Sequence, residues 1–187
     1  IITKPTMIQI SQVQVHNSHA LSFIERIYTD SFPDDERRAF AEVVKLLGEN
    51  DHFSIFLLSH NEKSVGFITR WEWDHFTYIE HFAIDNRYRG AGYGAAAMGE
   101  LLKHTDKPTI LEVEKPLDEI SSRRIRFYER LGFVLCKQPY TQPPYSPDKH
   151  SLELYLMSFG KINLDQQFAT VVNQIHREVY GVIDKNE

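Results

Sequence analysis

A turn rich in glycine is the sequence feature that most constrains the fold of this 187-residue chain. Gly90, Gly92 and Gly94 stand at alternate positions between a β-rich run that ends at Ile84 and an amphipathic run that follows. A strand that enters a helix through such a turn leaves the first helical N–H groups unshielded, where the helix dipole favours an anion. Arg89 adds a cation directly before them. The sequence therefore predicts a strand–turn–helix unit that can hold a pyrophosphate.

The glycine turn follows neither of two familiar phosphate-binding patterns. A P-loop requires Gly-Lys-Ser/Thr, whereas Gly94 is followed by Ala95 and Ala96. The dinucleotide fingerprint is Gly-x-Gly-x-x-Gly in a βαβ unit, whereas the spacing here is Gly-x-Gly-x-Gly after a run of strands. A tight turn that packs closely against its helix also explains the glycines, and this alternative needs no ligand.

The order of the predicted elements places this turn within a mixed sheet. A run of strands followed by alternating helices and strands indicates one sheet with helices packed on its faces. The predicted strands cover residues 8–13, 53–58, 64–71, 77–84, 109–114, 133–136 and 151–157. The predicted helices cover residues 20–28, 40–47, 94–104, 121–131 and 168–179. Residues 137–150 hold four of the eight prolines and are expected to form a loop.

Composition and charge limit the class of protein. Hydrophobic residues make up 42% and charged residues 25% of the chain, which suits one globular domain over residues 1–187. The net charge of −5 argues against a nucleic-acid partner. No apolar run approaches the ~20 residues that a membrane helix needs, so no membrane partner is expected. The single cysteine, Cys136, excludes an internal disulfide and favours a reducing, cytoplasmic compartment.

Nine histidines raise the question of a metal site. The chain has no His-Glu-x-x-His motif, and one cysteine cannot form a thiolate cluster. We therefore predict that the protein uses no metal.

Two segments together resemble the GCN5-related N-acetyltransferase family. Residues 89–94, Arg-Gly-Ala-Gly-Tyr-Gly, match that family's pyrophosphate motif, Arg/Gln-x-x-Gly-x-Gly/Ala. Residues 126–133, Arg-Phe-Tyr-Glu-Arg-Leu-Gly-Phe, are similar to its helix ending in Phe-Tyr-x-x-x-Gly-Phe. The resemblance implies a mixed α/β fold in a single domain. Its central, mostly antiparallel sheet has about seven strands flanked by helices, and a further helix stands at the C-terminus.

The resemblance also implies acetyl-coenzyme A as cosubstrate. The turn would bind its pyrophosphate through backbone N–H groups, and the preceding strand would pair with its pantetheine arm. The family often has Asn at the start of the second motif's helix and Ala three residues later, where this chain has Ser121 and Arg124; Ser121 can still cap the helix. The implied cofactor residues are Phe82, Ala83, Ile84, Arg89, Gly90, Ala91, Gly92, Tyr93, Gly94, Ala95 and Ser121.

Tyr128 is the residue that the family uses as a general acid. Attack of an amine on a thioester expels a thiolate, and a phenol with a pKa of ~10 can protonate it or donate a hydrogen bond to it. The alternative is a helix tyrosine whose ring only fills the core.

Two glutamates are candidates for the base that deprotonates the amine. Glu80 lies on the strand before the glycine turn, and Glu112 lies on the next strand in a Leu-Glu-Val context similar to that of some protein-acetylating members of the family. Either could instead be a solvated strand carboxylate, and a water relay could replace both. In a regular strand His81 would face away from Glu80, and a bulge would change this.

These features predict an enzyme that transfers an acetyl group from acetyl-coenzyme A to a primary amine within a ternary complex. An acyl-enzyme on Cys136 is less favoured because the sequence shows no activating partner for that thiol. A protein acetyltransferase acting on lysine or N-terminal amines, and a non-catalytic acyl-coenzyme A sensor, stay open as alternatives. A homodimer also stays open. The expected acceptor is an amine, either of a small molecule or of a protein.

Overall fold

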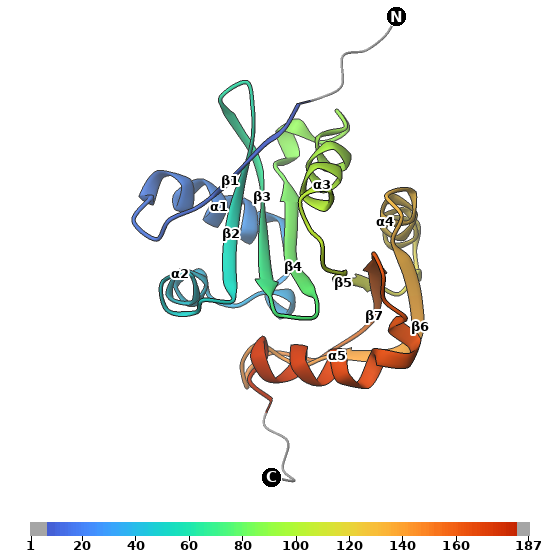
Figure 1. The fold of residues 1–187 in the computed structure, drawn as a ribbon. Coiled ribbons are helices and arrows are strands. Elements are labelled where there is room, and N and C mark those ends of the chain that lie inside the picture. Colours follow the sequence, from blue (N-terminus) through green and yellow to red (C-terminus); the bar gives the residue numbers. More distant parts are fainter. Residues whose placement is uncertain (1–6, 183–187) are drawn as a thin grey trace, which may run out of the picture. The chain divides into compact units, whose positions relative to one another are not determined.

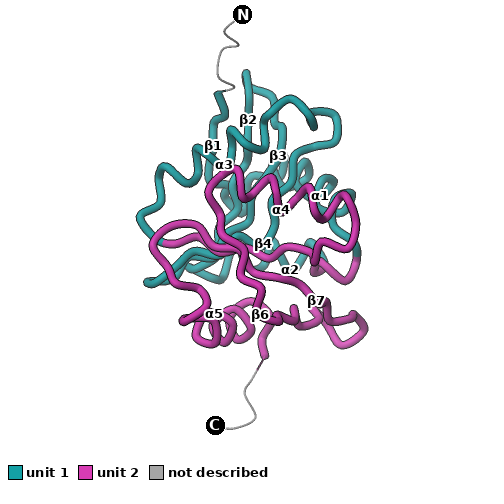
Figure 2. Tube along the Cα trace, turned by 90° about the vertical axis from the view of Figure 1, so that its right-hand side faces the viewer, with its two compact units in different colours: residues 1–33, 39–107 teal, residues 34–38, 108–187 magenta. Residues whose placement is uncertain are grey.

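The computed structural model describes residues 7–182, and these divide into two compact units (Figure 2). The first unit comprises the described residues up to Pro33 together with residues 39–107. The second comprises residues 34–38 and the described residues from Pro108 onward. Each unit holds part of the predicted site, so each is described by itself.

The first unit is a four-stranded antiparallel sheet with three helices (Figure 1). Its strands follow one another in the order β1-β2-β3-β4. They are β1 (Gln9–Gln12), β2 (Phe53–His60), β3 (Lys63–Glu72) and β4 (Thr77–Ile84). Its helices are α1 (Ser18–Ser31), α2 (Phe40–Glu49) and α3 (Tyr93–Lys103), and a 3₁₀ turn, η2 (Asn86–Tyr88), precedes α3.

The β2–β3 hairpin was predicted and is confirmed. Asn61 and Glu62 form its two-residue turn with φ angles of 47° and 63°, so His60 pairs with Lys63. A two-residue turn with positive φ at both positions matches the right-handed twist of the paired strands. Further along, a side chain at Gly66 would meet the Ala83 carbonyl oxygen at 2.4 Å, so only glycine lets β3 lie this close to β4.

Both faces of this sheet are covered. Figures 1 and 2 show α1 and α3 on opposite sides of the strands. Accordingly β3 has consecutive buried residues from Val65 to Thr69 rather than alternating buried and exposed ones. On the α1 side the Tyr28 ring lies 6.2 Å from that of Phe67, and both side chains are fully buried.

The second unit is a three-stranded antiparallel sheet with two helices. Its strands lie in the order β5-β7-β6. They are β5 (Thr109–Glu114), β6 (Val134–Gln142) and β7 (Leu152–Phe159). The helices are α4 (Glu119–Arg130) and α5 (Leu164–Glu178), and the unit also contains the 3₁₀ turn η1 (Asp34–Glu36). Leu164, Val171 and Ile175 form the buried stripe of α5.

The structure corrects the predicted loop over residues 137–150. Strand β6 continues to Gln142, and Tyr140 is buried in the core with 1% of its surface exposed. The register of β6 against β7 shifts between Cys136 and Tyr140. Pro139 lies in this irregularity, where a residue without an N–H group is tolerated. The prolines therefore indicated a bulge in an outer strand as well as the loop that follows it.

The start of α4 is a second correction. Asp118, not Ser121, is the N-cap, and the helix begins at Glu119. The Asp118 side chain accepts a hydrogen bond from the Ser121 backbone N–H at 2.7 Å, and the Ser121 hydroxyl oxygen accepts one from the Asp118 backbone N–H at 3.2 Å. Ser121 is therefore the third residue of the helix, paired with the N-cap Asp118 in a capping box, and is not itself the N-cap.

The predicted fold class is confirmed: the structure is α/β, with seven mostly antiparallel strands, flanking helices and a C-terminal helix. That residues 1–187 act as one acyltransferase domain stays a prediction. Within residues 7–182 no helix is both long and apolar enough to cross a bilayer.

Candidate active site

The glycine turn lies where β4 passes into α3, as predicted. Gly90 and Gly92 both have φ angles of +82°, which few other residues adopt. A side chain built on either glycine would meet no atom within 4 Å, so the outer side of the turn is open. Neither glycine is needed for close packing within the protein. The alternative that the glycines serve close helix packing therefore lacks support at these two positions.

The N-terminus of α3 is suited to an anion. Gly92 is the N-cap residue, no side chain caps the helix, and its first turn contains no acidic residue. The first N–H groups of a helix have no partner within the helix, and the dipole places partial positive charge there. Tyr93, Gly94 and Ala95 supply these groups, so a pyrophosphate at the turn would meet N–H donors and an open surface.

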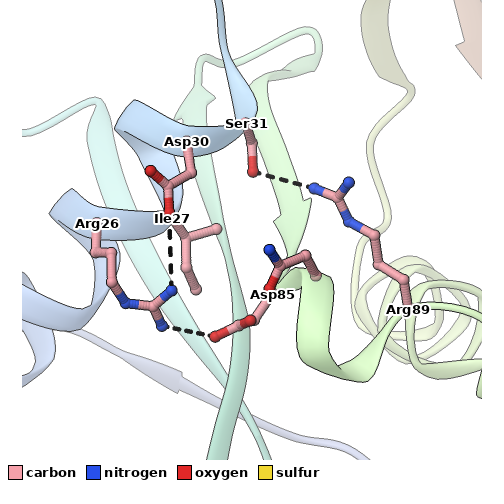
Figure 3. A pocket seen from close by; sticks show the side chains of 7 residues that line it. Arg26, Ile27, Asp30, Ser31, Asp85 and Arg89 are labelled. Carbon is pink, nitrogen blue, oxygen red and sulfur yellow. Dashed lines mark hydrogen bonds and ion pairs between the residues drawn. The ribbon is translucent and has the colours of Figure 1, made fainter.

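Arg89 does not point along the turn. Its Nε donates to the Ile84 carbonyl oxygen at 3.0 Å, and its Nη2 donates to the Ser31 hydroxyl at the end of α1 at 3.2 Å (Figure 3). It lines a small hollow of about 60 Å³ together with Arg26 and Asp85. Its predicted contact with the cofactor stays a prediction.

Asp85 organises the start of the turn, and the sequence analysis did not single it out. Its carboxylate is buried and accepts hydrogen bonds from Arg26 at 2.6 Å, from the Arg87 guanidinium at 2.6 Å and from the Arg87 backbone at 3.0 Å. Hydrogen bonding to Arg87, followed by that to Arg26, holds the Asp85 pKa far below its usual range. The two-residue spacing from Asp85 to Arg87 is typical of a side chain that caps its own turn, and could have indicated this role.

The predicted pantetheine strand contains a bulge. Thr69 pairs with His81 and Arg70 pairs with Ile79, so Glu80 is an extra residue in β4. The strand residues Phe82, Ala83 and Ile84 follow in regular pairing with β3, and Ala83 is buried. A bulge re-aims the side chains on either side of it, and such irregularities are frequent beside active sites.

Glu80 and His81 lie side by side at the bulge and have different partners. The Glu80 carboxylate accepts a hydrogen bond from the Trp71 indole N–H at 2.7 Å. His81 is buried, and its ring contacts those of Tyr28 and Phe32 of the α1 segment at 4.8 and 4.6 Å. Its backbone N–H donates to the Thr69 hydroxyl at 3.0 Å. The Trp71 indole thus holds the Glu80 carboxylate.

Glu112, in the second unit, lies among aromatic hydroxyls. Tyr140 on β6 donates a short hydrogen bond to its carboxylate, and the Tyr180 hydroxyl lies 3.1 Å from each of its two oxygens. The His176 ring contacts the rings of both tyrosines at 5.6 and 6.4 Å. No local signal could have identified Tyr180, because 68 positions separate it from Glu112 along the chain.

Tyr128 lies in α4 with 8% of its surface exposed. Its ring contacts those of Phe127 at 5.1 Å and Phe133 at 5.4 Å. Among the described residues its hydroxyl has no hydrogen-bond partner. Burial raises the Tyr128 pKa to about 12, so the phenol is protonated near neutral pH and can donate a hydrogen bond or a proton there.

A further carboxylate pair occurs in the second unit. Glu114 forms an ion pair with Arg124, the bulky residue on α4. Burial raises the pKa of Glu36, and the neighbouring Glu114 carboxylate raises it further, while Arg124 lowers it. The Glu36 and Glu114 carboxylates are therefore close enough to repel each other.

Cys136 and the histidines show no sign of a nucleophile or a metal centre. Burial raises the pKa of the Cys136 thiol, and its Sγ donates to Asp165 at 3.3 Å. A buried thiol beside a carboxylate is poorly reactive. Over residues 7–182 no three His, Cys, Asp or Glu side chains gather in a way that could hold a metal ion. The prediction that no metal is used stays a prediction.

The fold, the open glycine turn and the Phe-Tyr motif of α4 are those of an acetyltransferase. More particularly, the chain belongs to the GNAT acetyltransferase family, whose sequence model matches residues 14–133. This confirms the family predicted from the two motifs. The general reaction of the family is the transfer of an acetyl group from acetyl-coenzyme A.

Three of the solved structures that are similar to this one illustrate the range of relatives. A putative acetyltransferase of the GNAT family from Bacteroides thetaiotaomicron superposes with a TM-score of 0.90 and 32% identity, covering 94% of this chain and 99% of that one. The ribosomal-protein-S18-alanine N-acetyltransferase from Escherichia coli gives a TM-score of 0.59 at 21% identity, covering 82% of this chain and 93% of that chain.

Arabidopsis thaliana NAA60 in complex with acetyl-CoA gives a TM-score of 0.60 at 18% identity, covering 82% of this chain and 98% of that chain. At these identities the last two comparisons show the fold alone. A search of curated proteins found no match.

Proposed function

We propose that this protein is an N-acetyltransferase that transfers the acetyl group of acetyl-coenzyme A to a primary amine, with both substrates bound at once. The observation that carries the proposal is the open turn at Gly90 and Gly92 in front of the uncapped α3. A pyrophosphate is the chemical group that such a turn suits best. The family's general reaction supplies the acyl donor.

The proposed reaction requires a base for the amine and a hydrogen-bond donor for the departing thiolate. It proceeds without a covalent enzyme intermediate. The amine nitrogen attacks the thioester carbonyl carbon, the carbon–sulfur bond breaks, and the amine proton passes to a carboxylate. Glu80 and Glu112 are the proposed bases, and Tyr128 is proposed to donate to the departing sulfur. Direct attack is supported because the buried Cys136 thiol lacks a partner that would activate it.

We further propose that the acceptor carries positive charge. The chain has a net charge of −5, and in the second unit the Glu114 carboxylate raises the pKa of Glu36 although Arg124 pairs with Glu114. An ammonium group near these two carboxylates relieves their repulsion, which favours polyamines or basic peptides over neutral amines. The acetylation of protein amines is the alternative within the same class.

Calorimetry on a Gly92→Val variant tests the cofactor site. The added side chain fills the open space on the turn and strains a residue with a φ angle of +82°, so the dissociation constant for acetyl-coenzyme A should rise at least about tenfold. Gly99→Val, on the same helix with no atom within 4 Å, is the matched control and should bind normally. Equal affinity in both folded variants would contradict the assigned site.

A panel of amines tests the reaction. Free thiol released from acetyl-coenzyme A should depend on the amine, and mass spectrometry should find the acetyl group on its nitrogen. Comparison of Glu80→Gln with Glu112→Gln then identifies the base, since only its loss removes the acidic limb of the pH–rate profile. Tight binding of acetyl-coenzyme A without transfer to any amine would instead indicate a sensor.

A further inference from the structure

Glu112 is held by hydroxyls from two distant parts of the second unit. Tyr140 reaches it from β6, and Tyr180 reaches it from the segment that follows α5. Near neutral pH a carboxylate only accepts hydrogen bonds, so both phenols are donors to it. A glutamate side chain has several rotatable bonds, and fixing it costs conformational entropy. Two donors from rigid elements fix its orientation in advance of any substrate.

Tyr180 is itself fixed by its surroundings. Its ring lies 5.0 Å from that of Tyr145, and Arg38 covers the Tyr145 ring at 4.8 Å. Arg38 is buried and donates to the carbonyl oxygen of Val179, the residue before Tyr180, at 3.0 Å. The end of α5 therefore cannot move without breaking a buried contact with the segment at 34–38.

His176 adds a second point of attachment. It lies one turn before Tyr180 on α5, and its Nε2 lies 3.0 Å from the Thr141 carbonyl oxygen of β6. Its ring also contacts Tyr140 at 5.6 Å. The rings of the two tyrosines that hold Glu112 thus both contact His176, in addition to sharing the carboxylate.

We infer that Tyr180 and Tyr140 are positioning residues for Glu112, and that the segment after α5 for this reason contributes to catalysis. The inference rests on the proposed N-acetyl transfer with Glu112 as base. It extends the site beyond residues 14–133, the part of the chain that the family model matches. The two tyrosines act through their hydrogen bonds to Glu112 and set the direction in which its carboxylate meets the amine proton.

Three single variants measure the effect on turnover. Tyr180→Phe and Tyr140→Phe each remove one hydroxyl donor from a charged acceptor, and kcat should fall about 10- to 100-fold. The KM for acetyl-coenzyme A should change by less than about twofold, because the groups proposed to bind its pyrophosphate are the backbone N–H groups of residues 90–95. Tyr155→Phe, a half-buried β7 tyrosine that packs under Lys115, is the matched control and should keep full turnover.

A double-mutant cycle separates positioning from a merely structural role. If Tyr180 acts through Glu112, then Tyr180→Phe should lower kcat by less than about threefold in a Glu112→Gln background. The same loss in both backgrounds would overturn the inference, since it would mean that the hydroxyl acts on stability or on another group. Thermal unfolding of each variant verifies that the compared proteins are folded.

The outcomes also separate this inference from the proposed function. Full turnover by Glu112→Gln would leave N-acetyl transfer intact and overturn the inference, because Tyr180 would then have no base to position. Failure of the wild-type protein to acetylate any amine in the panel would overturn both.

Discussion

The Tyr128→Phe variant gives the most direct test of the proposed chemistry. The substitution removes one hydroxyl and keeps the ring that packs on Phe127 and Phe133. Among the described residues that hydroxyl has no hydrogen-bond partner, so its removal leaves no buried group unsatisfied. The free energy of unfolding should therefore change by less than about 0.5 kcal/mol. Any loss of activity then reports on the reaction rather than on the fold.

The size of the effect follows from the raised pKa of Tyr128, about 12. A thiol has a pKa of about 8.5, so full proton transfer from this phenol to a thiolate is uphill by roughly 3.5 pKa units, or about 5 kcal/mol. Donation of a hydrogen bond to the thiolate has no such penalty and is worth about 1.5–3 kcal/mol. We therefore expect kcat to fall about 10- to 100-fold in Tyr128→Phe, which at most reaches the lower limit of the roughly 100- to 10,000-fold range for a general acid.

The pH dependence of kcat is the assay that can refute this reasoning. A donor with a pKa near 12 stays protonated between about pH 7 and pH 10. Ionisation of Tyr128 should therefore cause no fall in wild-type kcat over this range, and Tyr128→Phe should leave the shape of the profile unchanged there. A basic limb below pH 10 that disappears in the variant would show that the phenol ionises much more easily than its burial implies. Unchanged turnover in Tyr128→Phe would remove the residue from the mechanism.

Three further predictions concern the framework of the site. Gly66→Ala should lower the free energy of unfolding by about 1–3 kcal/mol, because the added methyl group meets the Ala83 carbonyl oxygen. Gly99→Ala, in open space on α3, should instead raise the free energy of unfolding by up to about 1 kcal/mol. Urea titration of both variants measures these changes. Asp85→Asn should cost about 1–3 kcal/mol at pH 7, and, because the native pKa is lowered, this difference should shrink as the pH falls below about 4. Cys136→Ser should keep kcat within about threefold, and a larger loss would favour an acyl-enzyme.

The parts of the fold that depend on local pattern could be predicted from the sequence. The β2–β3 hairpin follows from two turn residues between β-rich runs, and α3 follows from the glycine turn and its apolar stripe. Residues 137–142 could not be assigned, because the pairing of β6 with β7 outweighs the local effect of Pro139. The predicted boundaries of α4 lie within two residues of the observed ones. Its N-cap could not be predicted, because the assignment depends on the hydrogen bonds between Asp118 and Ser121.

The candidate site also has a part that could be predicted from local sequence and a part that could not. The turn at Gly90 and Gly92 is a local feature, and its backbone conformation matches what the glycines indicated. The environments of Glu80 and Glu112 depend on partners brought together by folding: the Trp71 indole across a bulged pair of strands, and Tyr180 from the end of the last helix. A single sequence carries no record of such long-range pairs, so it could identify the carboxylates but not what holds them.

The irregularity at Pro139 has a consequence for self-association. Strand β6 stands at the end of the order β5-β7-β6, and an outer strand presents unpaired N–H and C=O groups to which another chain can add a strand. Pro139 provides no N–H group, and the shifted register bends the strand away from a straight ladder. An added strand could pair with only a few residues on either side of it. The irregularity thus disfavours edge-to-edge aggregation along β6, and a dimer that used this strand should form through side-chain surfaces rather than a continuous intermolecular sheet.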